Sequence, residues 1–404
     1  VWMIMLISYT FSVKALEKKN LNTWSYVSCR KLWNFRENKV SCNKSDLSVT
    51  GGTAFMEKNQ IFITCGTEYK EMTKRILEES GLAEQIGNKA FRIGNQAQIW
   101  FPLLIRLTGA TTHAEVLAGI IEYLQERGFR NLTLMEGSWV GDKTMDAFYA
   151  CGYDRLCDEY GVVFRDTQKD KSYTADCGGM ELHICTSVKD IDFLINVPVL
   201  KGHCQTKITC ALKNMKGLIP NSEKRRFHSL GLHKPIAHLN MGIRQDFIVV
   251  DNICGDLDFE DGGNPVVMNR VLTGRDPVLM DAYVCNLMHY EISDVPYVEL
   301  AGRLGVGCSE LEKADIRACG ADTGEQLPKS RKVVELADAV EEVESCSACY
   351  GYLIPALDML KQEGLLEKLH EKIHIGQGFR GKTGELGIGH CTRNFRHHLE
   401  GCPL

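Results

Sequence analysis

The sequence predicts an α/β protein with a mainly parallel sheet and helices on both of its faces, followed by a small cysteine-rich module. From Met56 to about residue 330, short apolar runs alternate with amphipathic segments, a rhythm typical of strand–helix–strand units. Runs such as 193–197 and 247–250 are apolar at almost every position, as strands are when both sides of a parallel sheet are covered. After residue 330 acidic and cysteine-containing segments replace this rhythm, which indicates a separate module over 331–404.

The individual elements follow from these patterns. We expect strands at 61–65, 91–93, 132–135, 162–164, 182–184, 193–197 and 247–250. We expect helices at 69–82, 112–128, 144–151, 205–216, 276–289, 296–304 and 333–343. In the second of these helices, Thr112 and Glu115 match a capping box, and Gly128 can end the helix without Cβ strain.

Residues 1–55 show no sustained helical or strand periodicity and differ from the rest of the chain. We expect the natural start at Met56, with 1–55 as a translated leader or a non-native addition. A disordered native tail is the alternative. N-terminal sequencing of the native protein distinguishes the two, and in both cases 56–330 forms the α/β core.

Composition limits the environment and the partners of the protein. A net charge of −5 argues against nucleic-acid binding, for which a basic protein is expected. The apolar opening, 1–13, is shorter than the ~20 residues that span a bilayer and lacks the features of a signal peptide, so no membrane association is expected. The 17 cysteines show no secreted disulfide framework, which indicates reduced thiols in the cytoplasm of an anaerobe. Five of them are expected to be core residues rather than ligands: Cys65, Cys151, Cys210, Cys254 and Cys285.

Four cysteines of the C-terminal module form a candidate ligand set. Cys346 and Cys349 are a C-x-x-C pair, whose sulfurs a tight turn brings together, and Cys391 and Cys402 each lie close to a glycine. Four thiolates suit a [4Fe–4S] cluster, and glycine lets backbone N–H groups approach its sulfide. A closed zinc site without a redox function is the alternative, and unligated thiols are a third reading.

The central segment, 200–234, reverses the acidic balance of the chain. It contains eight lysines and arginines against a single acid, Glu223. Such a concentration of positive charge attracts an anionic small molecule, for example a carboxylate or a phosphate. A solvated surface helix and loop is the alternative reading.

Within this segment, four residues are the candidate site. Lys201 and His203 follow the buried strand at 193–197, at the edge where parallel sheets bind ligands. Lys213 and Asn214 lie on the expected following helix, near one face with Thr206. A lysine and a histidine there can act as anion clamp and proton carrier.

Acidic residues follow the strand expected at 247–250. Asp251 closes this strand, and four further acids come next: Asp256, Asp258, Glu260 and Asp261. The glycine that an EF-hand requires is displaced, so an EF-hand is excluded. Magnesium ligands and solvated loop acids are the two readings that stay open.

Two motifs, Lys-Gly-His at 201–203 and Lys-Asn-Met at 213–215, resemble a family known only as domain of unknown function 362. Thr-Thr-His at 111–113, the stretch 246–265 and Gly-Arg-Asp-Pro at 274–277 add to the resemblance, which covers roughly 56–404. The C-terminal Cys-Ser-Ala-Cys, Gly-His-Cys-Thr and Gly-Cys-Pro pieces look like one branch of the family. The resemblance implies an iron–sulfur protein without naming a reaction. This chain has no ferredoxin-type run, so the implied cluster depends on the four C-terminal cysteines.

The chain departs from the family pattern after Gly94. The family usually carries Lys-Pro-Asn there, whereas this chain has Asn-Gln-Ala at 95–97 and then an unusual apolar stretch. Codons for Asn-Gln-Ala, such as AAT-CAA-GCC, encode Ile-Lys-Pro when they are read one base later. We therefore expect a local frameshift across about 95–107, which deletes a lysine from the site and which resequencing of the gene would test.

These observations favour a cluster-bearing redox protein. Electrons would enter through the cysteine module from a redox partner protein and reach an anionic substrate held by Lys201, His203, Lys213 and Asn214. The second hypothesis is a non-redox isomerase or racemase of an organic acid, distantly like the nickel-pincer lactate racemases. The third is a maturation factor that carries metal or cluster to a partner, and the fourth is a copy impaired by the frameshift.

Overall fold

The computed structural model of the protein describes residues 55–98, 109–259, 264–320 and 327–401, apart from the side chains of 347 and 348. The described residues belong to one compact unit. The expectations about residues 1–54 and 99–107 concern parts of the chain outside this description.

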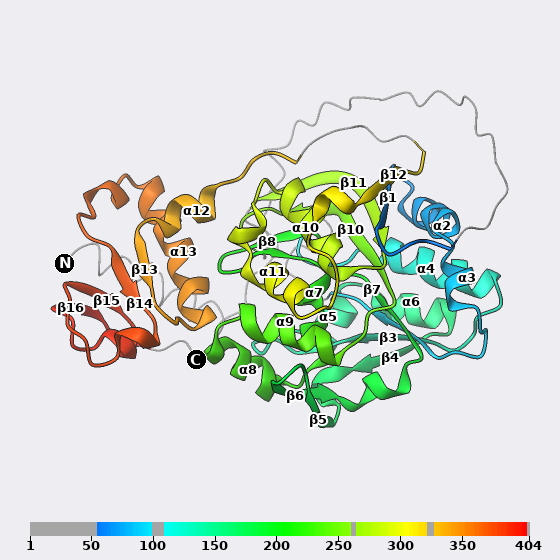
Figure 1. Ribbon diagram of the computed structural model, residues 1–404, viewed down its shortest axis with the longest axis horizontal. Helices are drawn as coiled ribbons and strands as arrows, with labels where there is room; N and C mark the ends of the chain where they lie inside the picture. Colours follow the sequence, from blue (N-terminus) through cyan, green and yellow to red (C-terminus); the bar gives the residue numbers. More distant parts are fainter. Residues whose placement is uncertain (1–54, 99–108, 260–263, 321–326, 402–404) are drawn as a thin grey trace, which may run out of the picture. The chain divides into compact units, whose positions relative to one another are not determined.

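In the described part of the chain, the core is a mixed sheet of eight strands (Figure 1). Across the sheet the order is β12 (Asp315–Ala318), β1 (Gln60–Cys65), β11 (Pro265–Gly274), β10 (Phe247–Asp256), β7 (Phe193–Asn196), β2 (Ile93–Gln96), β3 (Leu132–Glu136) and β4 (Val163–Asp166). The five strands from β10 to β4 are mutually parallel, and β11 runs antiparallel to both of its neighbours. The predicted α/β fold with a mainly parallel sheet is confirmed, although the sequence analysis does not predict β11.

Helices cover both faces of this sheet. One face packs against α2 (Tyr69–Glu79), α3 (Leu82–Ile86), α4 (Ala114–Glu126), α5 (Thr144–Ala150) and α6 (Tyr153–Tyr160). The other packs against α7 (Ala211–Asn214), α8 (Asn221–Leu230), α9 (His233–Gly242), α10 (Pro277–Leu287) and α11 (Pro296–Arg303). None of the helices in the described ranges combines the length and the hydrophobicity that crossing a bilayer requires.

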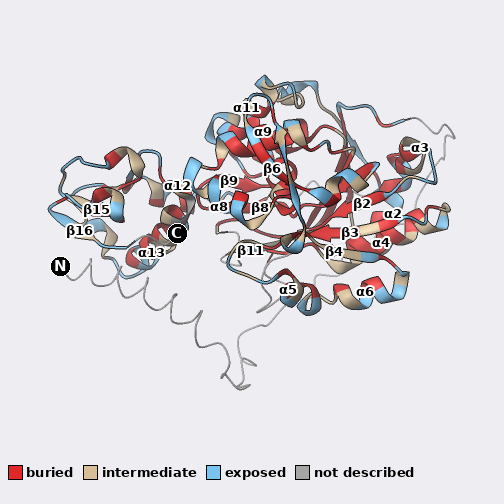
Figure 2. Cartoon of the chain, turned by 90° about the horizontal axis from the view of Figure 1, so that it is seen from below, coloured by how far each residue is buried: buried red, intermediate tan, exposed pale blue. Residues whose placement is uncertain are grey.

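The strands serve both cores because successive side chains point to opposite faces. On β10, Phe247 and Val249 belong to the core that contains α2 and α4. Ile248 and Val250 belong to the core that contains α9 and α10. Figure 2 shows β2 and β3 as buried strands between their layers of helices. The near-continuous apolar runs of the sequence therefore reflect burial on two sides.

Two hairpins lie outside the main sheet. β5 (Ser172–Asp176) pairs with β6 (Glu181–Cys185), and β8 (Lys201–His203) pairs with β9 (Lys207–Thr209). The strand expected at 182–184 thus belongs to a hairpin. The helix expected at 205–216 is wrong in its first half, because β9 pairs with β8 and Lys207 has a positive φ of 65°.

Helix α4 begins without the predicted capping box. Its N-cap residue is His113, whose side chain makes no capping bond. The Thr112 hydroxyl instead donates to the carbonyl of Val197 over 2.9 Å and accepts from the N–H of Gln98. The capping-box prediction is therefore wrong, because a tertiary contact uses the hydroxyl. The predicted end of the helix before Gly128, which has a φ of 88°, is confirmed.

Residues after 331 form a second sheet, with four parallel strands in the described ranges. Its order is β13 (Val340–Glu342), β14 (Ile373–Ile375), β15 (Leu386–Ile388) and β16 (His397–Leu399). Two helices accompany it, α12 (Lys332–Ala337) and α13 (Ser347–Gln362). The helix predicted over 333–343 is wrong in its second half, because Val340 pairs with Ile373 in the parallel ladder.

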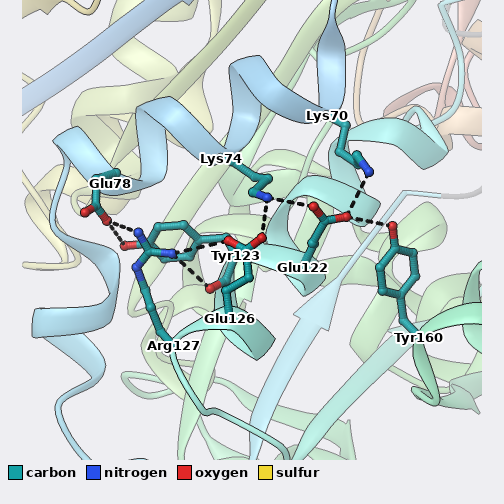
Figure 3. A network of polar contacts seen from close by, with 8 residues as sticks. All are labelled: Lys70, Lys74, Glu78, Glu122, Tyr123, Glu126, Arg127 and Tyr160. Carbon is teal, nitrogen blue, oxygen red and sulfur yellow. Dashed lines mark hydrogen bonds and ion pairs between the residues drawn. The ribbon is translucent and has the colours of Figure 1, made fainter.

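An ion-pair network joins α2 to α4 (Figure 3). The Glu122 carboxylate accepts hydrogen bonds from Lys70 at 2.8 Å, from Lys74 at 2.6 Å and from the Tyr160 hydroxyl at 3.0 Å. The bonds from Lys70 and Lys74 hold the pKa of Glu122 well below its usual range, at about 2. The same network also contains Glu78, Tyr123, Glu126 and Arg127.

Strand β2 carries a buried amide that has no hydrogen-bond partner among the described residues. Asn95 is 0% exposed, and neither its Nδ2 nor its Oδ1 is bonded. In the two neighbouring strands it lies opposite Leu134 and Ile195, which are apolar. A buried polar group without a partner costs about 1–3 kcal/mol, so this position suits an apolar side chain better. The predicted frameshift would make residue 95 isoleucine, and it stays a prediction because 99–107 lie outside the description.

Replacing Glu122 by glutamine is expected to lower the free energy of unfolding at neutral pH by about 1 kcal/mol, because the network loses its central charge. The pKa of Glu122 is lower in the folded protein, so its stabilisation is present above the ordinary value of 4.5 and is lost as pH falls through about 2. Thermal unfolding between pH 2 and 7 measures this. The control is Glu126→Gln, whose half-exposed carboxylate contributes less. Equal losses, or a loss that does not depend on pH, would contradict the prediction.

Replacing Asn95 by leucine is expected to raise the free energy of unfolding by about 1–3 kcal/mol, because two unpaired buried polar atoms disappear. The matched control is Asn196→Leu in the adjacent strand. The Asn196 amide donates to the carbonyl of Ala211 at 2.8 Å and to Gln245 Oε1 at 2.6 Å, so its loss should destabilise the protein. Denaturant unfolding of both variants measures the change in the free energy of unfolding, which should be positive for Asn95→Leu and negative for Asn196→Leu. A destabilised Asn95→Leu variant would show that the amide has a partner.

Candidate functional site

The parallel strands β2, β3 and β7 end in polar residues at one edge of the sheet. Gln96, Glu136 and Asn196 are all buried there. From β2 the chain continues to β3 on one side of β2 and later returns to form β7 on the other side, so the direction of strand addition reverses at β2. Open α/β sheets bind ligands at such a change of direction, outside the carboxyl ends of the strands.

Asn214, one of the four predicted site residues, is part of this edge. Its Nδ2 donates to Asn196 Oδ1 at 2.7 Å and to the carbonyl of Gln96 at 3.3 Å. It therefore connects the ends of β2 and β7. Its amide is a structural element of the edge, and contact with a ligand stays a prediction.

The other three predicted residues lie on or beside the hairpin β8–β9. The fully buried Lys201 donates to the carbonyl of Ala110 at 2.9 Å, and the buried Lys213 donates to the Thr209 hydroxyl at 2.9 Å. His203 Nδ1 accepts the N–H groups of the two residues at 205 and 206, both at 3.1 Å. When neutral, the His203 ring therefore carries its proton on Nε2.

The predicted helix face shared by Thr206, Lys213 and Asn214 is wrong. Thr206 lies in the turn between β8 and β9, where its hydroxyl donates to the carbonyl of Ile208 at 3.0 Å. Only Lys213 and Asn214 lie on α7. Sequence periodicity cannot distinguish this hairpin from a helix, because the hairpin is decided by strand pairing.

The basic segment is partly buried, so the reading as a wholly solvated surface is wrong. Its buried cations are Lys201, Lys213 and Lys224, and its exposed cations are Arg225, Arg226 and Lys234. Burial, assisted by the charges of Lys207 and Lys213, lowers the pKa of His233 to about 4. His233 is therefore neutral near pH 7, and the positive charge is carried by the lysines.

A buried acid–base pair at the same edge is missing from the sequence prediction. Glu136 Oε2 accepts from Gln96 Nε2 at 2.8 Å, and Oε1 accepts from the N–H of Gly137 at 2.8 Å. The ammonium of Lys224 donates to the carbonyls of Gly137 at 2.6 Å and Ser138 at 2.8 Å. Burial raises the pKa of Glu136 and lowers that of Lys224, and the charge of each partner opposes this shift. The two groups therefore lie within electrostatic range of each other at this edge.

Asp251 orients a histidine. Its Oδ2 accepts from the backbone N–H of His113 at 2.7 Å and lies 2.8 Å from His113 Nδ1. Its Oδ1 accepts from the N–H of Ile253 at 3.0 Å. His113 belongs to the Thr-Thr-His motif, which was the signal for this contact in the sequence.

Two of the acids that follow Asp251 are described by the structure, and neither is solvated. The interpretation as solvated loop acids is therefore wrong for these two. Asp256 and Asp258 are buried. Asp256 Oδ1 accepts three backbone N–H groups, at 258, 259 and 264, and Asp258 pairs with Lys332 at 3.3 Å. Glu260 and Asp261 lie outside the described residues, and magnesium binding stays a prediction.

The cysteine module brings two of its predicted ligand segments together. Cys346 is the N-cap residue of α13, and the N–H of Cys349 donates to its carbonyl at 3.0 Å. Cys391 lies in η8 (His390–Thr392), the turn after β15. Gly389 begins this turn with a φ of 89°, and a Cβ there would lie 4.0 Å from Cys349 Sγ. The Cys349 thiol therefore faces the turn that contains Cys391.

The fourth predicted ligand, Cys402, lies outside the described residues. In the sequence it follows Leu399 by the same three positions by which Cys391 follows Ile388, and Leu399 pairs with Ile388. Within the described ranges, no group of three or more His, Cys, Asp or Glu side chains is arranged to hold a metal ion. The four-cysteine set therefore stays a prediction.

A cavity of about 150 Å³ is lined by other residues. Its walls include Met135, Leu194, Leu218, Arg244 and Asp246. Leu194 is the second residue of β7, and Asp246 directly precedes β10. None of the predicted site residues contributes to it.

A sequence match covers part of the core. The family described as Domain of unknown function (DUF362) matches residues 106–286, which include the hairpin β8–β9 and α7. The thylakoid-associated protein sll1697 of Synechocystis sp. is 21% identical over 208 residues, which make up 50% of this chain and 64% of that protein. The chain thus spans less than two thirds of that relative.

Two solved structures match about half of the chain. The lactate racemase apoprotein from Thermoanaerobacterium thermosaccharolyticum has a TM-score of 0.36 at 12% identity, over 53% of this chain and 54% of its own. A protein from Thermotoga maritima has a TM-score of 0.30 at 15% identity, over 46% and 51%. These partial likenesses carry no functional conclusion. The motif resemblance and the sequence match point to the same family, whose model matches residues 106–286 of this chain.

Proposed function

We propose that this chain is an iron–sulfur protein that exchanges electrons with an anionic small molecule bound beside the hairpin β8–β9. Cys346, Cys349, Cys391 and Cys402 would hold a [4Fe–4S] cluster. The observation that supports the proposal is the position of Gly389, where a Cβ would lie 4.0 Å from Cys349 Sγ and which precedes the turn that contains Cys391.

The parallel ladder explains why these segments meet. The carboxyl ends of β13, β14 and β15 lie at one edge, so the turns that follow them are neighbours. Cys346 follows β13, and Cys391 follows β15. Thiolates in glycine-containing turns fit an iron–sulfur cluster, which supplies one-electron chemistry when it is bound. The chain's own contribution is to orient these thiols and to limit their exposure.

The second part of the proposal is that an anion binds beside the hairpin β8–β9, close enough to the cysteine module to exchange electrons. Burial lowers the pKa of Lys207, and the charges of Cys204 and Glu342 oppose this shift. Burial raises the pKa of Tyr350, and Glu342 and Cys204 act in the same direction. Groups of the hairpin and of the module therefore lie within electrostatic range of each other. A bound anion near Lys201 and Lys213 would lie on the side of the core that the module adjoins.

Protein purified without oxygen is expected to be brown and to contain about four irons per chain with a similar amount of sulfide. Cys391→Ser should lose most of this iron, because one thiolate ligand disappears. The matched control is Cys308→Ser, a half-buried cysteine outside the module, which should keep its iron. Iron, zinc and sulfide analysis with visible absorption spectra measures the result. Zinc without iron, or equal iron in both variants, would refute the cluster.

Lys213→Met is expected to slow reoxidation of the reduced protein by small anions about 10- to 100-fold, the range that corresponds to losing one charge-assisted hydrogen bond. The probes are 2-oxo acids, anions that can accept two electrons and two protons to become 2-hydroxy acids, mixed with dithionite-reduced protein in a stopped-flow instrument. Methionine keeps most of the side-chain volume at this buried position. Lys234→Met, a change of an exposed lysine of the same segment, is the control. Equal rates for the two variants would remove Lys213 from the site.

A further inference from the structure

The turn after β14 contains the amide of Gln377, and the turn after β15 contains the thiol of Cys391. The N–H of Gln377 donates to the carbonyl of Glu344 at 3.1 Å, and the N–H of Gly378 donates to that of Val343 at 3.0 Å. Gly376 has a φ of 117°, and a Cβ there would lie 2.0 Å from the carbonyl oxygen of Val343. The turn is therefore pinned against the segment that leads into Cys346.

This backbone arrangement aims the side chain of Gln377 at two groups. Its Nε2 lies 3.6 Å from Cys346 Sγ, within the range for a hydrogen bond to sulfur. The same nitrogen donates to the carbonyl of Ser229 at 2.7 Å. A side-chain amide has two N–H groups on one nitrogen, so it can serve both acceptors at once.

Ser229 lies in the last turn of α8, whose carbonyl groups have no partner within the helix. Lys224, one turn earlier in the same helix, donates to the carbonyls of Gly137 and Ser138 at the end of β3. Helix α8 is thus bonded to the carboxyl edge of the main sheet by Lys224 and to the cysteine module by Gln377. It is one physical connection between the carboxyl edge of the main sheet and the cysteine module.

We infer that Gln377 is a positioning residue that raises the reduction potential of the cluster and ties the Cys346 side of the module to α8. The inference rests on the proposed function. A hydrogen bond to a ligand sulfur stabilises the more negative, reduced cluster, which makes reduction easier. The second N–H of the same nitrogen bonds to the carbonyl of Ser229, so the position of Gln377 beside Cys346 depends on the position of α8.

The test compares Gln377→Met with Gln362→Met. Methionine is similar in size and cannot donate, and Gln362 is an exposed amide on α13 that donates to Asp358 at 3.1 Å. Redox titration of the cluster, followed by its visible and electron paramagnetic resonance signals, should show a more negative potential for Gln377→Met alone. Hydrogen exchange of the metal-free proteins should show faster exchange at the end of α8 in that variant alone.

The outcomes separate this inference from the proposed function. A cluster with the same potential in both variants would overturn the role of Gln377 while leaving the cluster intact. Absence of iron from the unmodified protein would overturn the proposed function. In that case hydrogen exchange still decides the link to α8, because faster exchange supports it and unchanged exchange removes it.

Discussion

Buried amide and carboxylate side chains lie at the carboxyl ends of β2, β3 and β7, and each of them requires a hydrogen-bond partner. They are bonded to one another and to nearby backbone groups, and this requirement determines the arrangement of the centre of the molecule. Gln96 donates to Glu136, and Asn214 donates to Asn196. Each such group would cost about 1–3 kcal/mol if it were buried without a partner. Asn214 of α7 supplies one of these partners, and Lys224 of α8 donates to the carbonyls of Gly137 and Ser138 just after β3. Both helices are therefore held against the sheet edge by polar bonds as well as by apolar packing. Lys213, next to Asn214, takes its position from the same constraint.

The cysteine module repeats the arrangement on a smaller scale. Parallel pairing of β13, β14 and β15 brings the turns after these strands to one edge. In the main sheet the corresponding positions carry amides, a carboxylate and a lysine, whereas in the module they carry thiols and the amide of Gln377. The chemistry differs because the side chains differ, and the convergence has the same geometric cause in both sheets.

The candidate site could be predicted from the sequence only where a residue follows a recognisable strand or motif. Asn214 and Lys201 were proposed because they lie in or near such motifs. Asn214 lies at the carboxyl edge of the sheet, and ligand contact of either residue stays a prediction. Glu136 and Lys224 were not paired, because 88 positions of sequence separate two residues that are adjacent in the fold. The prediction that Thr206 and Lys213 share a helix face is wrong, because strand pairing between β8 and β9 outweighs the local preference for a helix.

The sequence by itself determined the α/β class, most strand positions and the resemblance to the DUF362 family, because these depend on local apolar patterns and short motifs. It also contained the spacing that relates Cys391 to Cys402. Only the tertiary structure decided which polar residues face each other: His113 with Asp251, Glu136 with Lys224, and Gln377 with Cys346. Such contacts join residues from distant parts of the chain, and their geometry is set by how strands pair and helices pack, which no local pattern encodes.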